Sequence, residues 1–168
     1  MLLKEMFESQ KKLDRRIIKE HNLEGKDLFN NEIVAMVVEL SECANEVRFF
    51  KHWSNKGPSA KEVILEEFVD VLHFGLSIGN MIGEYEILEH DYKATLNYKD
   101  LTDSFIEIVN TIGALQHKRN SKLGIVLYVQ LMELLLNFGE KLGFTEKEIE
   151  MAYYKKNEVN HKRQDNNY

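Results

Sequence analysis

The chain has 168 residues, of which 43% are hydrophobic and 30% charged, with one proline and a net charge of −6. This length suits one domain with a real core, and the net negative charge argues against general binding of nucleic acid through its phosphates. No apolar run approaches the ~20 residues of a membrane span, so we expect no membrane partner. The single cysteine, Cys43, excludes an internal disulfide, and the N-terminus shows no secretory signal, so a cytoplasmic location is expected.

The first predicted element is an amphipathic helix over residues 2–22, with apolar residues at helical spacing. Gln10 and Asp14 lie one turn apart on this helix, and their pattern alone favours ordinary surface residues. Residues 22–31 form a polar connection, and Asn30 or Asn31 can cap the helix that follows.

Two apolar helices, predicted over residues 33–50 and 63–79, organise the rest of the chain. Each carries two carboxylates three residues apart, which places both on one side of a helix. These carboxylates belong to Glu39, Glu42, Glu67 and Asp70. Acids that face a packed interior need counter-charge, and no Lys or Arg lies on the acidic side of either helix, which we call its acidic stripe. A solvated face would explain a single pair, but two pairs inside nearly all-apolar helices predict a site for a hard cation such as Mg²⁺.

The connection between these helices, residues 51–58, contains the only tryptophan of the chain, Trp53, close to Lys51. The loop could gate a ligand, or Trp53 could simply plug the end of the bundle, and the pattern does not separate the two. Ser59 and Glu62 match a capping box, which predicts that the second acidic helix begins near Ser59. This helix is apolar on nearly all sides, so it is predicted to be central.

The remaining chain predicts further helices joined by short turns. Gly75, Gly79 and Gly83 recur every four residues, which favours close approach of a neighbouring helix. Residues 84–100 match no element clearly. Thr102 can cap a helix to about residue 117, Ser121 can cap a helix over 122–142 that ends at Gly143, and Thr145 with Glu148 forms another capping box. We therefore predict an all-α bundle of about six helices, whose broad apolar faces favour a dimer.

The last helix changes character along its length. From Ile149 onward one face is first apolar and then carries Lys156, Asn160 and Arg163. Such a tail can simply fray. Equally, ammonium, amide and guanidinium donors are the groups that phosphate oxygens accept from.

Three ordered blocks resemble the dimeric all-α dUTP diphosphatases, within the wider MazG-like all-α nucleoside triphosphate pyrophosphatases. The blocks are VELSECANEVRFFKHWS, EEFVDVLHFGLSIGN and YYKKNEVNHKRQDNNY. The E-x-x-E and E-x-x-D pair marks the superfamily, whereas KHWS and the K-N-x-x-N-x-x-R-Q tail are more specific. The resemblance implies one all-α pyrophosphatase-like domain over residues 1–168, with 145–168 as a substrate-binding helix and tail.

The resemblance also implies a reaction: hydrolysis of dUTP to dUMP and pyrophosphate with Mg²⁺, two or more ions per site, in a homodimer. dUDP is a further candidate substrate. By position, the metal ligands would be Glu39, Glu42, Glu67 and Asp70, and Glu39 or Glu42 would take the proton of the attacking water. The substrate-binding residues would be Gln10, at a position similar to one that contacts uracil, and Lys51, Trp53, Asn80, Lys156, Asn160 and Arg163. The tail lacks the glycine expected before Tyr168, which leaves Tyr168 without a role.

Three other functions remain open at this point. The same metal site could serve a pyrophosphatase for dCTP or a modified base. A di-metal redox bundle would need two Glu-x-x-His motifs, and the chain has only one analogue, Asp70-x-x-His73, in which His73 is expected to be a core residue. A non-catalytic helical interaction protein would show no Mg²⁺-dependent turnover.

Overall fold

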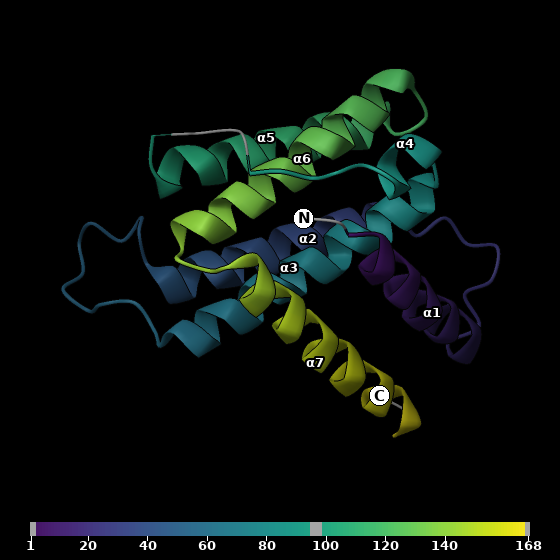
Figure 1. Ribbon diagram of the computed structural model, residues 1–168, viewed down its shortest axis with the longest axis horizontal. Coiled ribbons are helices and arrows are strands. Elements are labelled where there is room, and N and C mark those ends of the chain that lie inside the picture. The colour runs from purple at the N-terminus through teal and green to yellow at the C-terminus, as the bar shows by residue number, and fades with distance from the viewer. Residues whose placement is uncertain (1–2, 95–98, 167–168) are drawn as a thin grey trace.

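The computed structural model describes residues 3–94 and 99–166 and contains seven helices and no strand within them (Figure 1). The helices are α1 (Lys4–Glu20), α2 (Phe29–Val47), α3 (Lys61–Ile82), α4 (Tyr85–Leu88), α5 (Leu101–Lys118), α6 (Lys122–Lys141) and α7 (Glu146–Asp165). The predicted all-α bundle is confirmed. The seventh helix is the one-turn α4, in the segment whose periodicity was too weak to assign.

Helix α3 is the centre of the bundle, as its apolar character predicted. It contacts α2 along its length and also contacts α1, α4, α6 and α7. Figure 1 shows α5 and α6 side by side above the α2–α3 pair, and α1 and α7 below it. Half of α3 is buried, including Val69, Leu72, Leu76 and Ile78. The two acidic helices are thus neighbours, so their carboxylates can meet.

Gly75 and Gly79, the two glycines inside α3, allow a close helix contact. A Cβ atom on Gly75 would lie 3.0 Å from Sδ of Met132, and one on Gly79 would collide with the Tyr128 hydroxyl. Tyr128 is fully buried in this position and donates a 2.8 Å hydrogen bond to the Gly75 carbonyl oxygen. Gly83 has another role, because it ends α3 with φ = 70°, a conformation that favours glycine.

The predicted helix ends after residue 120 are confirmed. Ser121 caps α6 by accepting a hydrogen bond from the Gly124 amide, and Thr145 with Glu148 forms a complete capping box on α7. Gly143 has φ = 83° just beyond the end of α6, as expected of a glycine that ends a helix.

Three of the earlier cap predictions are wrong. The N-cap of α2 is Leu28, so Asn30 and Asn31 lie inside the helix. Ser59 does not cap α3, because its hydroxyl donates to the Glu46 carboxylate instead, and Ala60 takes the N-cap position. Asp100, rather than Thr102, caps α5, since its carboxylate accepts from the amides of residues 102 and 103.

Helix α6 is apolar enough to cross a membrane by length and composition, with an 18-residue window of mean hydropathy 1.3. However, 56% of that window is buried inside the bundle, where it packs on α5 and α3. Core helices commonly show this combination, so it is weak evidence for a membrane span. Cys43 is also a core residue, with 0% exposure.

Candidate functional site

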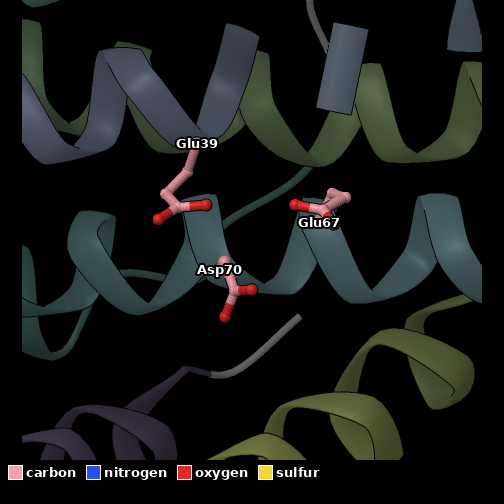
Figure 2. A group of neighbouring side chains, drawn as sticks. All are labelled: Glu39, Glu67 and Asp70. Atoms are coloured by element: carbon pink, nitrogen blue, oxygen red, sulfur yellow. The ribbon is translucent and has the colours of Figure 1, made fainter. Parts of the chain in front are cut away.

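Three carboxylates meet where α2 and α3 face each other. One oxygen each from Glu39, Glu67 and Asp70 lies within 4.8 Å of the others. Glu39 reaches across from α2, and Glu67 and Asp70 project from adjacent turns of α3 (Figure 2). The three-residue step between Glu67 and Asp70 produces this geometry, because it returns the chain to the same side of the helix.

Partial burial acts on all three groups, and repulsion from neighbouring acids adds to it. The pKa of Glu39 is raised to about 7, first by burial and then by the charges of Asp70, Glu42 and Glu67. The pKa values of Glu67 and Asp70 are also raised, with burial as the largest cause. Concentrated negative charge on hard oxygen atoms fits a divalent cation such as Mg²⁺.

Glu42 stands apart from this group. It is exposed and contributes no oxygen to the 4.8 Å cluster, yet it lies close enough to raise the pKa values of both Glu39 and Glu67. Its assignment as a fourth metal ligand therefore stays a prediction.

Lys156 supplies a positive charge that neither acidic stripe contains. Its Nζ atom lies 2.7 Å from Oδ2 of Asp70 and 3.0 Å from Oε1 of Glu66. Helix α7 packs on α3 and so brings Lys156, predicted to bind phosphate, to the edge of the carboxylate cluster. One ammonium group leaves the three acids largely uncompensated.

Asn160 and Arg163 follow Lys156 along α7. Nη1 of Arg163 lies 3.3 Å from Oδ1 of Asn160, and the Arg163 charge helps to lower the pKa of Glu66. These two residues and Lys156 occupy positions i, i+4 and i+7, which share a helix face. This row of three donors therefore begins at the carboxylate cluster and continues along α7 beyond it.

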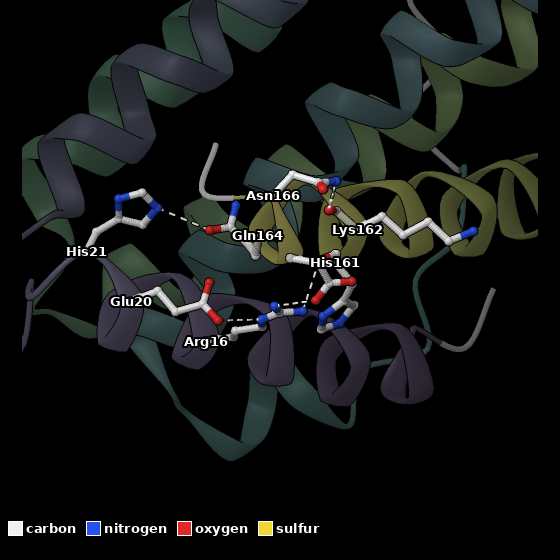
Figure 3. Close-up of polar contacts among 8 residues, drawn as sticks. Arg16, Glu20, His21, His161, Lys162, Gln164 and Asn166 are labelled. Carbon is white, nitrogen blue, oxygen red and sulfur yellow. Dashed lines mark hydrogen bonds and ion pairs between the residues drawn. The ribbon is translucent and has the colours of Figure 1, made fainter.

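The far end of α7 is fixed to α1 rather than frayed. Arg16 donates to the His161 carbonyl oxygen at 2.9 Å and to the Asp165 carboxylate at 2.6 Å, and it also pairs with Glu20 (Figure 3). His21 contacts Gln164 at 3.1 Å in the same region. Tyr168 lies outside the described residues.

A second polar cluster lies between α1, α3 and α7. Gln10 is 4% exposed, so its interpretation as a surface residue is wrong. Its Oε1 atom lies 2.7 Å from Nδ1 of His73 and accepts from the Tyr153 hydroxyl at 3.2 Å, while its amide nitrogen donates to Asp14. Since Oε1 is an acceptor, Nδ1 of His73 carries the proton. Burial lowers the pKa of His73 to about 3, so the ring is neutral.

Two further acids extend this cluster. Burial raises the pKa of Asp14 to about 7 and also raises that of Glu32, and the nearby Ser77 hydroxyl opposes both shifts. Sequence reasoning singled out Asp14 but missed Glu32, Ser77 and Tyr153. The four-residue step from His73 to Ser77, which places two polar side chains on one side of an apolar helix, was the available signal.

Three predicted substrate residues are not gathered at the carboxylates. Trp53 is 67% exposed and contacts Phe50 and His52, and Nζ of Lys51 lies over the Phe50 ring. Their loop projects beyond the ends of α2 and α3 (Figure 1). Asn80 donates to the Phe7 carbonyl oxygen at 2.9 Å and so ties α3 to α1. Substrate roles for these residues stay predictions.

Comparison with known proteins agrees with this arrangement. A family model described as dUTPase matches residues 2–168, which is nearly the whole chain. A search of curated proteins finds no match. The resemblance drawn from the sequence is confirmed, and the interpretation as a non-catalytic interaction protein is wrong. The chain belongs to the all-helical dUTPase family and is a dUTP diphosphatase, a nucleoside triphosphate pyrophosphohydrolase.

Proposed function

We propose that the enzyme hydrolyses dUTP to dUMP and pyrophosphate with Mg²⁺, by attack of water on the α-phosphorus. One observation carries the proposal: oxygens of Glu39, Glu67 and Asp70 converge within 4.8 Å in a chain of the dUTPase family. A metal-free hydrolase would have little use for three partly buried acids held this close together.

The proposed metal ligands are Glu39, Glu67 and Asp70, with Glu42 as the fourth. Four carboxylates carry enough charge for two or more ions. When bound there, Mg²⁺ would supply an activated water and offset the charge that develops on the phosphates. The chain's own contribution is to hold these acids on two packed helices, so that their positions do not depend on a loop.

Glu42 is the better placed of the two candidate bases. Glu39 faces Glu67 and Asp70, so both of its oxygens would bind the ions. Glu42 lies outside the cluster but within electrostatic reach of it, so one of its oxygens would bind an ion and the other would face the attacking water. A carboxylate in contact with the attacking water is suited to take its proton. Glu39 would serve as the base only if Glu42 bound the ions more closely than Glu39 does.

The row of Lys156, Asn160 and Arg163 is the proposed site for the phosphates. Its cationic members would stabilise negative charge on the departing pyrophosphate. Lys51 and Trp53 would have to approach with their loop when the nucleotide binds. The row begins at Asp70 and continues away from it, as a triphosphate extending from the metal site requires.

The second polar cluster is the proposed site for the base. Uracil presents two carbonyl acceptors and one N–H donor on its pairing edge. Gln10 keeps one amide N–H beyond its bond to Asp14, and the Asp14 carboxyl group supplies an acceptor. Asn80, one turn after Ser77, is assigned to the same region. Burial of these groups would make an unsatisfied partner costly, which is a strong basis for selecting one base.

A pyrophosphate-release assay on dUTP, dCTP and dTTP, with and without Mg²⁺, tests the proposal, and release of inorganic phosphate from dUDP tests the further candidate substrate. We expect fast release from dUTP with Mg²⁺ and none in EDTA. A preference for dCTP or dTTP would reject the substrate assignment. In H₂¹⁸O, attack on the α-phosphorus places the label in dUMP, and label in pyrophosphate would reject that mechanism.

We also propose a homodimer in the cytoplasm. Val34 and Val38 lie one turn apart on α2 and are 62% and 46% exposed, which supports an apolar contact with a second copy. Light scattering after gel filtration tests this assembly. A monomeric mass at micromolar concentration would contradict it.

A further inference from the structure

Glu66 is an acid that the proposed reaction does not use, although it directly precedes the metal ligand Glu67. Its side chain is 63% exposed, yet it contacts Lys156, whose own side chain is only 11% exposed. Lys156 lines a groove of about 600 Å³ between α3 and α7, together with the apolar residues Leu65, Val69 and Ala152. Glu66 therefore meets a lysine that packing already confines.

The Lys156 ammonium is held by two carboxylates with different roles. Asp70 belongs to the metal cluster, and Glu66 does not. An ammonium group has three N–H donors and no acceptor. Two donors point to Oδ2 of Asp70 and Oε1 of Glu66, at 2.7 Å and 3.0 Å, so one remains for a third acceptor.

We infer that Glu66 is a positioning residue, which holds Lys156 at the edge of the metal site so that its remaining N–H meets a phosphate oxygen of the nucleotide. This inference rests on the proposed function. When Asp70 gives its oxygens to a cation, Glu66 is the acceptor that keeps the ammonium in place. Without Glu66, the Lys156 ammonium would be held by Asp70 alone and would adopt other orientations in the groove. The phosphate site would then lose its fixed N–H donor.

The test is nucleotide affinity, measured by calorimetry with a dUTP analogue whose α,β-bridging oxygen is replaced by NH, in Mg²⁺. We expect Glu66→Ala to weaken binding by about three- to five-fold, as for a partly exposed ion pair, and Glu66→Gln, which keeps a neutral acceptor, to restore part of the loss. Glu62→Ala, an exposed acid one turn earlier on α3, is the matched control and should bind like the wild type.

A double variant separates positioning from general electrostatics. If Glu66 acts through Lys156, then Glu66→Ala should have no further effect in a Lys156→Ala background. Mn²⁺ binding without nucleotide should be the same in Glu66→Ala and the wild type, and KM should rise while kcat changes little. Equal losses from Glu66→Ala with and without Lys156, or wild-type affinity in Glu66→Ala, would overturn the inference. A wild-type enzyme that does not release pyrophosphate from dUTP would instead overturn the proposed function.

Discussion

Nζ of Lys156 lies 2.7 Å from Oδ2 of Asp70, so the last helix brings a positive side chain to the carboxylates of α2 and α3. This contact joins the two halves of the site, because Asp70 belongs to the carboxylate cluster and Lys156 begins the row of phosphate donors. A displacement of α7 would therefore change the metal site and the phosphate site together.

Replacement of Glu67 by Gln tests the carboxylate cluster while preserving side-chain size. We expect dUTP turnover to fall on the order of 100-fold, because one charged metal ligand is lost. The metal-free protein should be no less stable to heat, since the change removes a group repelled by Asp70 and Glu42. Glu62→Gln on the same helix is the control. An unchanged rate at saturating Mg²⁺ would contradict the assignment.

Trp53 offers a direct optical test of its loop, because it is the only tryptophan in the chain and is 67% exposed. If the loop closes on the nucleotide, tryptophan emission should shift to shorter wavelength when a non-hydrolysable dUTP analogue binds with Mg²⁺. Trp53→Ala should weaken binding with little effect on the thermal midpoint. An emission spectrum that does not change at saturation would contradict loop closure and would favour the alternative, in which Trp53 only covers the end of the bundle.

Arg16 should control the order of the C-terminal end of α7. Arg16→Ala removes the bonds to His161 and Asp165, which fix the last turns of α7 to α1. We expect faster amide exchange in residues 161–166 and a KM raised by up to about five-fold. Lys162→Ala, which removes only the surface pair with Glu158, serves as the control. Wild-type exchange in the Arg16 variant would contradict this role.

The raised pKa of Asp14 predicts how stability depends on pH. Burial raises this pKa from 3.8 to about 7, so folding favours the protonated form. The resulting stabilisation is fully present below pH 3.8 and is lost as the pH rises through 7. In EDTA, Asp14→Asn should therefore gain stability relative to the wild type between pH 5 and about pH 8. If the urea midpoints of the variant and the wild type differ by the same amount at every pH in this range, the raised pKa of Asp14 is contradicted.

The carboxylate cluster could be predicted from sequence because its geometry is local. Glu67 and Asp70 share a helix face through their three-residue spacing, and the apolar residues around them indicated burial. Glu39 on the neighbouring helix completed the pattern, since two apolar helices joined by one loop tend to pack together. The caps at Ser121 and Thr145 succeeded for the same reason.

The long-range contacts could not be predicted in this way. Gln10 and His73 are 63 residues apart and form a 2.7 Å contact only because α1 packs on α3. From sequence, Gln10 has the spacing of a surface residue, and the pattern does not indicate which face α7 will cover. Ser59 shows the same limit, because Glu46 on another helix competes for its hydroxyl.

Mn²⁺ binding, followed by electron paramagnetic resonance, tests most directly whether Glu39, Glu67 and Asp70 together form a cation site. The comparison is between the wild type and the double variant Glu39→Gln, Asp70→Asn, each shown to be helical by circular dichroism. We expect saturable binding by the wild type, with loss of the free-ion signal, and no binding by the variant at the same concentrations. Binding of Mn²⁺ by the variant with wild-type affinity would contradict the account.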